Sequence, residues 1–397
     1  MAESVESCSF CGRHKNDVAK LIVNESVAIC NQCVDLCQEL LTDTTKDVKP
    51  ASIDMDPRSL KTFLDQYVIG QEQAKKNISV AIINHVKRMN RKKDDPEIAK
   101  ANILLVGPTG SGKTLLAKTV ARYLDVPFVI ADATSLTEAG YVGDDVEMLI
   151  SRLYAVSGND VEKTQKGIVF VDEVDKISRK GESASITRDV SGEGVQQALL
   201  KLVEGTTCRI PTAGNRRHPA ADYIEIDTSE ILFIAGGAFV GVDSLIKSRV
   251  QGSSMGFAAV IASSTAPDLS QLTSDDLIKF GLIPEFVGRF PNIVTLAALT
   301  QQDMMAVLTE VKNNYITQYQ WIFQQDGVEL EITVPALEAI VDLAMCSRTG
   351  ARSLQGHLEK VLMPHMFELA GYRSLGIDRV VIGADQVNNP TPLEDAI

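Results

Sequence analysis

Four cysteines near the N-terminus have the spacing of metal ligands. Cys8 and Cys11 form one CxxC pair, and Cys30 and Cys33 form a second pair after eighteen intervening residues. Each CxxC turn can present two thiolates to one side of a tetrahedral ion, and the spacing between the pairs is that of a four-cysteine zinc site. Because four protein ligands leave no open position for a catalytic water, the pattern predicts a structural Zn²⁺ site.

The segment around these cysteines is too short to fold on apolar burial alone. A domain of about 40 residues buries little apolar surface, so we expect the metal to supply most of its folding free energy. Cys37 and His14 are further residues of ligand type, but four thiolates already complete the shell, and we expect neither to bind the ion. The alternative is that the spacing arose by chance and the thiols are free.

A second chemical motif is a glycine-rich loop, GPTGSGKT, at residues 107–114. It follows a short apolar run of buried-strand type and precedes a helical pattern, which is the context that a phosphate-binding loop requires. Glycines in such a loop let backbone N–H groups turn towards phosphate oxygens, while Lys113 places a cation on the β- and γ-phosphates and the Thr114 hydroxyl ligates Mg²⁺. The residues predicted to bind nucleotide here are Gly107, Pro108, Thr109, Gly110, Ser111, Gly112, Lys113, Thr114 and Leu115.

Two adjacent carboxylates, Asp172 and Glu173, end a later apolar run, GIVFVDE. Because the same domain contains a phosphate-binding loop, Asp172 is predicted to bind Mg²⁺, and Glu173 is predicted to polarise the water that attacks the γ-phosphate. Taken alone, an acidic pair after a strand is more simply a solvated turn. Together the two motifs predict hydrolysis of ATP, with Lys113 and Glu173 as catalytic residues.

The elements that must position these residues indicate an α/β fold. Further apolar runs, at residues 128–132, 231–237 and 292–296, alternate with helical segments. This alternation predicts a mainly parallel sheet with helices on both faces. From about residue 299 the pattern changes to helical periodicity with one strand-like run, VELEITV, which indicates a smaller α/β domain.

Composition and charge bound the possible functions. The chain has 397 residues, of which 45% are hydrophobic, and its net charge of −13 reflects 39 Lys and Arg against 52 Asp and Glu. Phosphate neutralisation needs clustered cations, so this balance argues against non-specific binding of nucleic acid. The most basic stretch, residues 85–93, is interpreted as a solvated helix end. No apolar stretch is long enough to span a bilayer and the first residues do not resemble a signal peptide, so we expect a cytoplasmic protein.

Beyond these motifs, the sequence resembles the ClpX family of AAA+ protein unfoldases along nearly its whole length, from the four-cysteine module to TGARSLQ at residues 349–355. The resemblance implies an AAA+ P-loop NTPase with a parallel sheet, a smaller C-terminal α/β lid domain and a small N-terminal four-cysteine zinc-binding domain. The domain boundaries expected on this basis are a zinc-binding domain at 1–45, a linker at 46–62, an AAA+ large domain at 63–298, an AAA+ small domain at 299–388 and a tail at 389–397.

Three family motifs add residues to the nucleotide site. DQYVIGQ matches the box that folds over the adenine, which implies that Val68 and Ile69 contact the base. GLIPEFVGRFP matches the segment that projects an arginine across the subunit boundary, which implies that Arg289 is an arginine finger acting in trans. TGAR matches the sensor-2 motif and implies that Arg352 binds nucleotide from the small domain. A guanidinium at either place would neutralise charge on the transferred phosphoryl group. Either arginine taken alone could instead be a surface salt-bridge partner.

Three loops imply a pore that handles polypeptide. GYVG matches the loop that lines the axial pore, so the resemblance implies that Tyr141 and Val142 grip a translocating chain; the alternative is a tight turn with a buried tyrosine. SITRDVSGEGVQQ matches the second pore loop. NRRHP matches the basic loop at the pore entrance, with Arg216, Arg217 and His218 in the charged places, and such an entrance would favour negatively charged chain ends.

A further loop, SSMGFAA, resembles the exposed tripeptide by which the family docks onto the ClpP peptidase ring. Here the tripeptide is Met255, Gly256 and Phe257, with Met where Ile or Leu is common. The alternative is a glycine-rich surface loop whose Phe folds inward. The sequence contains no GxSxG or HExxH motif, so peptide cleavage would come from a partner.

The resemblance as a whole implies a homohexamer that uses ATP, Mg²⁺ and Zn²⁺. Such a ring would recognise tagged or adaptor-delivered proteins, unfold them and thread them into a ClpP-type peptidase, and its zinc domains would dimerise or recruit adaptors. We expect no membrane partner and no direct nucleic acid partner. Two alternatives stay open: a remodelling chaperone that acts without a peptidase, and a nucleic-acid-remodelling AAA+ ATPase, which would need a basic channel.

Overall fold

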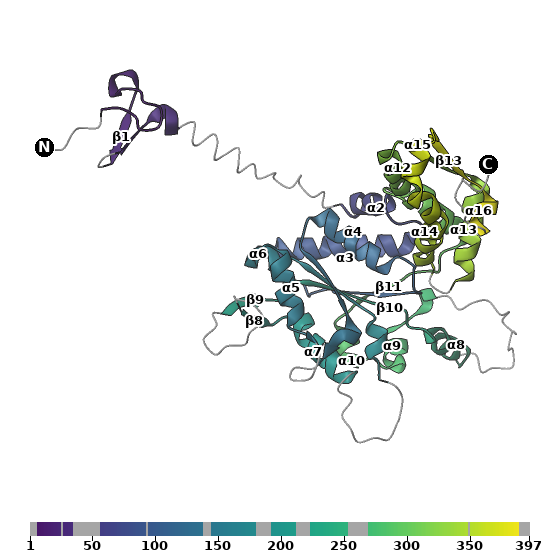
Figure 1. The fold of residues 1–397 in the computed structure, drawn as a ribbon. Coiled ribbons are helices and arrows are strands. Elements are labelled where there is room, and N and C mark those ends of the chain that lie inside the picture. The colour runs from purple at the N-terminus through teal and green to yellow at the C-terminus, as the bar shows by residue number, and fades with distance from the viewer. Residues whose placement is uncertain are drawn as a thin grey trace. The chain divides into compact units, whose positions relative to one another are not determined.

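The computed structural model describes nine stretches of the chain, which are residues 6–24, 27–34, 56–92, 94–137, 144–179, 192–211, 223–252, 269–347 and 350–388. The chain divides into two compact units, Met1–Asp54 and Met55–Ile397. Figure 1 labels the helices and strands of both units along the chain. Within the described residues, no helix is both long enough and apolar enough to cross a bilayer.

The first unit is built on a β-hairpin. A short 3-10 helix, η1 (Lys15–Asp17), precedes strands β1 (Leu21–Asn24) and β2 (Val27–Cys30), which pair antiparallel with Leu21 opposite Cys30. The buried cluster at its centre consists of three cysteines, and only partly buried apolar side chains pack against it. This core is too small to stabilise a fold by apolar burial, which agrees with the expected dependence on metal.

The second unit contains a five-stranded sheet in which every pairing is parallel, as the sequence predicts. Its strands are β3 (Ile103–Val106), β4 (Phe128–Asp132), β7 (Ile168–Asp172), β10 (Leu232–Gly237) and β11 (Asn292–Thr295). They lie in the order β11-β3-β10-β7-β4, so the strand that carries the phosphate-binding loop has a neighbour on each side. All residues of β3 and β10 are buried, as expected for strands covered on both faces.

Helices cover this sheet, with α3 and α4 drawn on one side of it in Figure 1 and α7 and α9 on the other. The helices of the large domain are α2 (Pro57–Asp65), α3 (Glu72–Met89), α4 (Lys113–Leu124), α5 (Met148–Val156), α6 (Val161–Gln165), α7 (Glu193–Glu204), α8 (Val242–Gly252), α9 (Ser274–Phe280) and α10 (Pro284–Gly288). Three 3-10 helices are η2 (Ala133–Ser135), η3 (Val174–Ile177) and η4 (Leu269–Gln271). Two short pairs complete the domain, β5 (Leu136–Thr137) with β6 (Asp144–Asp145), and β8 (Thr207–Pro211) with β9 (Tyr223–Asp227).

Helix α2 begins inside the range that the sequence assigned to the linker. The Asp56 side chain accepts a hydrogen bond from the Arg58 backbone N–H, and Pro57 occupies the first turn, where its missing N–H is not needed. Leu60 and Leu64, one helical turn apart, are fully buried. The capping signals and the apolar spacing therefore outweigh the polar, proline-containing composition that suggested a linker.

The interpretation of residues 85–93 as a solvated helix end is wrong for its first half. His85 is 3% exposed. The Arg88 guanidinium donates to the Ser229 carbonyl oxygen at 2.9 Å and lies 3.0 Å from the Glu230 carboxylate. Charge composition alone could not show this, because the partners of Arg88 lie about 140 residues further along the chain.

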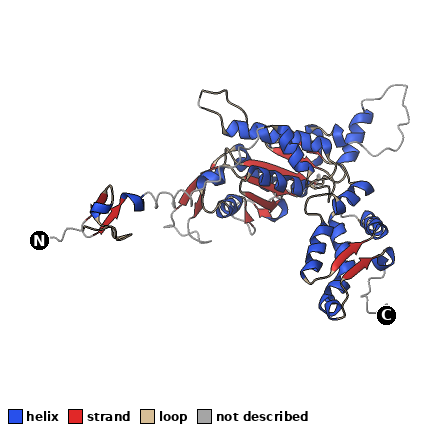
Figure 2. Cartoon of the chain, turned by 90° about the horizontal axis from the view of Figure 1, so that it is seen from above, coloured by secondary structure: helices blue, strands red, loops and turns tan. Residues whose placement is uncertain are grey.

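The small domain forms a separate group of helices around two parallel strands, at the lower right of Figure 2. Its elements are α11 (Gln301–Thr309), α12 (Tyr315–Gln325), β12 (Glu329–Ile332), α13 (Val334–Cys346), α14 (Arg352–Phe367), α15 (Leu369–Ser374), β13 (Arg379–Ile382) and α16 (Ala384–Asn388). It has its own buried core, which includes Phe323, Leu358 and Tyr372. The strand predicted from VELEITV is confirmed as β12.

Candidate nucleotide and zinc sites

A cleft of about 490 Å³ lies at the edge of the sheet where the parallel strands end, and residues of the large and the small domain line it. Strand β3 ends at Val106, directly before the glycine-rich loop, and β7 ends at Asp172. Carboxyl ends of parallel strands meet at one edge, so the fold brings the two sequence motifs together. The carboxyl edge of an open α/β sheet is also where such folds bind ligands.

Backbone conformation explains the glycines of the loop. Gly110 and Gly112 have φ values of 79° and 98°, in the left-handed region that glycine adopts without strain. At Gly107, a Cβ atom would lie 2.7 Å from the Leu296 carbonyl oxygen, so only glycine fits between the loop and the chain leaving β11. Helix α4 begins directly after Gly112, and its free N–H groups and positive dipole end favour an anion at the loop.

Lys113 lies at the centre of this cradle and is 8% exposed. Its ammonium donates to the carbonyl oxygens of Gly107 and Pro108 at 2.7 and 2.9 Å. Burial lowers the pKa of Lys113, while the nearby carboxylates of Asp172 and Asp175 oppose that shift. The cation is therefore held in the loop by neutral acceptors, and a phosphate group would be a stronger partner.

Two oxygen ligands suited to Mg²⁺ already lie in contact. The Thr114 hydroxyl donates to the Asp172 carboxylate at 3.0 Å. Carboxylate and hydroxyl oxygens, together with substrate phosphates, are what Mg²⁺ binds in nucleotide sites, so the residues fit this ion. Glu173 follows in a left-handed conformation, φ 58°, and lines the cleft. Asp175, which sequence reasoning missed, lines it as well and accepts from the Ala238 backbone N–H at 3.1 Å.

Apolar side chains line another part of the cleft. Val68, which is 4% exposed, and Ile69 line it, as expected for residues that contact a base. Sequence reasoning missed Tyr67 beside them and the whole contribution of α11, α12 and the residues between these helices. The additional lining residues from the small domain are Leu299, Val307, Val311, Lys312, Asn313, Asn314, Tyr315 and Gln318.

The small domain also reaches the phosphate end. Arg352, the first residue of α14, lines the cleft, and its charge contributes to lowering the pKa of Lys113. The residue two before it, Gly350, packs so closely that a Cβ there would lie 2.8 Å from the Thr109 carbonyl oxygen. The TGAR segment and the phosphate loop are therefore in direct backbone contact, although about 240 residues separate them in the sequence.

Arg289 is not among the residues that line this cleft. Its guanidinium pairs with Glu204 of the same chain, at 2.9 Å from Nε and 2.6 Å from Nη2. Its carbonyl oxygen accepts from the side chain of Asn102, which directly precedes β3. The structure thus places Arg289 at the amino edge of the sheet, whereas the phosphate loop lies at the carboxyl edge.

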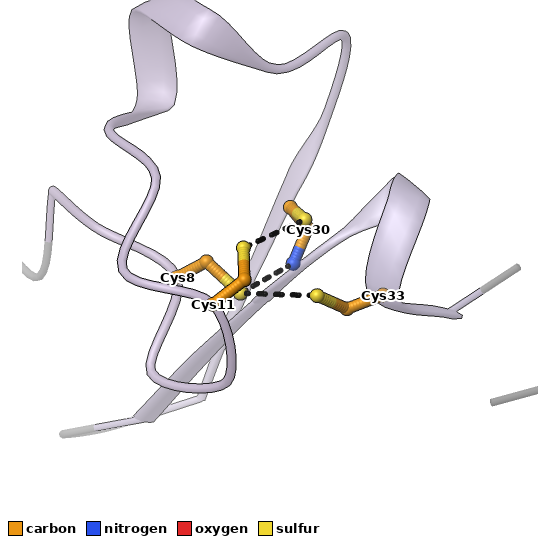
Figure 3. A group of neighbouring side chains, drawn as sticks. All are labelled: Cys8, Cys11, Cys30 and Cys33. Atoms are coloured by element: carbon orange, nitrogen blue, oxygen red, sulfur yellow. Dashed lines mark hydrogen bonds between the residues drawn. The ribbon is translucent and has the colours of Figure 1, made fainter. Parts of the chain in front are cut away.

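The four N-terminal cysteines form one cluster (Figure 3), in which all Sγ atoms lie within 4.8 Å of one another. The Cys8 and Cys33 sulfurs are 3.9 Å apart, and those of Cys11 and Cys30 are 3.7 Å apart. Four thiolates about 2.3 Å from a tetrahedral Zn²⁺ would be about 3.8 Å apart, so the donor set fits the ion. Burial and hydrogen bonds to the other thiols raise the pKa of Cys33, and a bound cation would oppose this shift by favouring the thiolate. His14 lies outside the cluster, as expected, and contacts Glu6 instead.

Most residues predicted for the pore and all those predicted for peptidase docking lie outside the described part of the chain, as does Cys37. The masked candidates are Tyr141, Val142, Arg216, Arg217, His218, Met255, Gly256 and Phe257. Of the second pore loop, residues 185–191 also lie outside it, whereas the last five residues, from Glu193, form the start of α7.

The sheet order, the phosphate loop, the acidic pair and the small α/β domain define a P-loop ATPase of the AAA+ class that also carries a four-cysteine zinc module. Comparison with known families agrees. Residues 6–43 match the ClpX C4-type zinc finger, residues 98–293 match the AAA domain (Cdc48 subfamily), and residues 299–374 match the C-terminal, D2-small domain, of ClpB protein.

Curated relatives extend this match to nearly the whole chain. Proteins of Borrelia duttonii and Borrelia recurrentis named ATP-dependent Clp protease ATP-binding subunit ClpX are each 47% identical over 399 residues, which cover 98% of this chain and 92% of theirs. A protein of the same name from Treponema denticola is 47% identical over 388 residues, covering 95% and 94% of the two chains. The chain belongs to the ClpX family. The predicted fold class, the ATPase activity and the use of ATP, Mg²⁺ and Zn²⁺ are thereby confirmed.

Proposed function

We propose that the chain is the unfolding and translocating subunit of a Clp protease. In this proposal six copies form a ring, ATP binds in each cleft next to a neighbouring subunit, and hydrolysis moves a polypeptide through the axial pore into a ClpP-type peptidase. The name shared by the curated relatives, ATP-dependent Clp protease ATP-binding subunit, supports the peptidase partnership.

The observation that best supports a ring is the position of Arg289. Four residues of β3 separate the Asn102 side chain that binds its carbonyl from the phosphate loop. A strand rises about 3.3 Å per residue, so roughly 13 Å of sheet lies between Arg289 and its own phosphate site. An arginine finger at this edge would act on the nucleotide of an adjacent copy, and a closed ring supplies such a neighbour to every subunit.

Within one cleft, the residues divide the chemical work. Lys113 and Arg352 neutralise phosphate charge, Thr114 and Asp172 hold the divalent ion, and Glu173 orients and polarises the water. The bound Mg²⁺ supplies Lewis-acid stabilisation of the charge on the phosphates. Because Arg352 belongs to the small domain, loss of the γ-phosphate would weaken its hold on the cleft, and the small domain would be free to change its position.

The pore and docking residues carry the mechanical part of the proposal. Tyr141 and Val142 would grip the chain without regard to its sequence, while Arg216, Arg217 and His218 would attract acidic chain ends at the entrance. The tripeptide Met255, Gly256 and Phe257 would insert into the peptidase ring. These roles are supported by the family to which the chain belongs.

The zinc module presents a surface suited to a partner. Four of its apolar side chains are at least half exposed, and they are Phe10, Ile22, Val23 and Val27. Three of the four belong to the hairpin strands β1 and β2. In a unit this small, so much exposed apolar area favours contact with another protein. Ile22 and Val23 are consecutive in β1 and therefore lie on opposite faces of the hairpin, and we infer that the module uses these exposed side chains to dimerise or to bind adaptors and substrates.

The test is the ATP-dependent loss of fluorescence from a stably folded reporter that bears an unstructured C-terminal tag. We expect loss with the wild-type protein, ATP and a ClpP-type peptidase, no loss with Tyr141→Ala, and retention of activity with Tyr141→Phe, which keeps an aromatic grip. A Phe257→Ala variant should hydrolyse ATP but fail to deliver the reporter to the peptidase. ATP turnover by the wild-type protein without loss of fluorescence under any condition would overturn the proposal in favour of a remodelling role.

A further inference from the structure

The segment at residues 66–71, here named the strap, connects α2 to α3 and contacts both domains of the second unit. At its start, the Gln66 carbonyl oxygen accepts a hydrogen bond of 2.7 Å from the Lys312 backbone N–H, which lies between α11 and α12 of the small domain. The next residue, Tyr67, lines the cleft, and the Lys312 ammonium lies 5.8 Å from the centre of its ring. Lys312 is thus joined to the start of the strap twice, by a backbone hydrogen bond to Gln66 and by a cation–π contact with Tyr67.

The other end of the strap is tied to the point where the chain passes between the domains. The Gln71 side-chain amide forms two hydrogen bonds with the backbone of Ala297, donating at 2.8 Å and accepting at 3.0 Å. Ala297 follows β11 by two residues and precedes the small domain. The same amide nitrogen lies 3.5 Å from the Ser111 carbonyl oxygen of the phosphate loop. Gln71 therefore links the phosphate loop to the start of the small domain.

Between these two ends, the strap packs against the start of the small domain. At Gly70, a Cβ atom would lie 3.3 Å from the Asp303 carboxylate, which closes the N-terminus of α11. Val68 and Ile69 occupy the same stretch and line the apolar end of the cleft. Val68 and Ile69, which are expected to contact the base, thus lie on a segment that is hydrogen-bonded at both ends. One end is bonded to the small domain, and the other to the chain that leads into it.

We propose that the strap is a two-point latch that couples the base end of the nucleotide site to the position of the small domain, with Tyr67 and Lys312 as its positioning residues. When Lys312 is seated on Tyr67, the residues between α11 and α12 close over the base, and Val68 and Ile69 are held against it. Releasing that contact leaves the phosphate end intact but lets the base end open. The latch concerns nucleotide binding and does not depend on any role in unfolding or peptidase docking.

The chain offers a matched control. Arg122, in the last turn of α4, also places its guanidinium over the Tyr67 ring, at 5.1 Å from the ring centre. Replacing Arg122 removes a cation–π contact to the same ring, but one made within the large domain. Because Lys312 is exposed, Lys312→Met should fold normally. The comparison of Lys312→Met with Arg122→Met therefore separates the latch from general support of the tyrosine.

The experiment combines steady-state ATP hydrolysis with amide hydrogen exchange of the full chain. We expect Lys312→Met and Tyr67→Leu to raise KM for ATP by about threefold to tenfold with kcat changed less than about twofold. The double variant should be no worse than Tyr67→Leu alone, and both single variants should increase exchange of the Lys312 amide. The conservative single variants Tyr67→Phe, which keeps the ring, and Lys312→Arg, which keeps the cation, should each have the wild-type KM for ATP. Arg122→Met should leave exchange of the Lys312 amide as in the wild type.

Two results would overturn the latch. One is a wild-type KM together with wild-type amide exchange in both Tyr67→Leu and Lys312→Met. The other is additive effects of the two substitutions on KM, because independent sites add and coupled sites do not. Absence of reporter unfolding by the wild-type protein would refute the proposed function and leave these measurements interpretable, since they need only ATP turnover.

Discussion

Replacing Gly350 by Ala should weaken ATP binding far more than it weakens the fold. Gly350 has a φ of 58°, and a Cβ built on it would lie 2.8 Å from the Thr109 carbonyl oxygen of the phosphate loop. The substitution therefore has two consequences of different kinds. One is backbone strain in the small domain, and the other is a clash between the small domain and the nucleotide site.

The size of each effect follows from the geometry. An alanine in the left-handed region costs about 1 kcal/mol relative to glycine, and this lowers stability whatever the surroundings. The clash involves backbone on both sides, and it is relieved only when the contact widens from 2.8 Å to at least 3.4 Å. That movement displaces Arg352 and the loop that binds phosphate. Because misplacements of about 1 Å in a site cost up to a hundredfold, we expect KM for ATP to rise at least about tenfold.

Gly376→Ala is the matched control for this prediction. Gly376 has a φ of 75° in the same small domain, and nothing lies within 4 Å of the position of its Cβ. Both variants should lose a similar amount of thermal stability, but only Gly350→Ala should change KM in a coupled ATPase assay. Equal KM values in the two variants would refute the reasoning, because the contact with Thr109 would then be without effect.

Three further predictions concern separate parts of the chain. Glu173→Gln should bind a fluorescent ATP analogue like the wild type while its turnover falls by about 10² to 10⁴, and near-normal turnover would remove Glu173 from its role. Cys33→Ser should lose bound zinc and the amide protection of the hairpin while ATP turnover stays within about twofold; retained protection without metal would contradict a zinc-dependent fold. Burial, with the nearby charges of Arg88 and Lys100, lowers the pKa of His85 to about 3. As pH falls, the unfolded chain therefore binds this proton first, and the fold loses about 2 kcal/mol between pH 6.5 and 5. His85→Gln should remove that loss from the pH dependence of the melting temperature, and an unchanged profile would show that His85 does not cause it.

The chemistry of both sites was predictable because each of their motifs is short and local in the sequence. The two CxxC pairs and the phosphate loop each combine residue types at spacings that few other structures require, and the acidic pair stands at the end of a strand that can be recognised by its apolar run. The parallel sheet followed from the alternation of such runs with helical segments, since each strand needs a crossover to return to the same edge.

The contribution of the small domain to the cleft was not predictable in this way. Val307, Val311 and Tyr315 have the spacing of an ordinary amphipathic helix surface, and periodicity does not say whether that surface meets a core or a ligand. In the sequence, nothing distinguishes Lys312 from a solvated cation, because its contact with Tyr67 exists only in the folded chain. Arg88 shows the same limit, because its partners Ser229 and Glu230 lie more than 100 residues away along the chain. Contacts across domains depend on tertiary packing, which local patterns do not encode.

The state of Lys113 shows how the cleft can be stable before nucleotide binds and still bind it firmly. Its ammonium is buried and must be hydrogen-bonded, because an unpaired buried charge is costly. The carbonyl oxygens of Gly107 and Pro108 meet that need, and the Thr114 hydroxyl likewise uses Asp172. Phosphate oxygens carry full negative charge and would replace neutral carbonyls as the stronger partner of the cation. Nucleotide binding would therefore replace the hydrogen bonds of Lys113 to carbonyl oxygens by stronger ones to phosphate, and at no stage would the buried ammonium be left unpaired. Burial is the main cause that lowers the pKa of Lys113, and the like charge of Arg352 adds to it, so incoming phosphates would also offset the repulsion between these two cations.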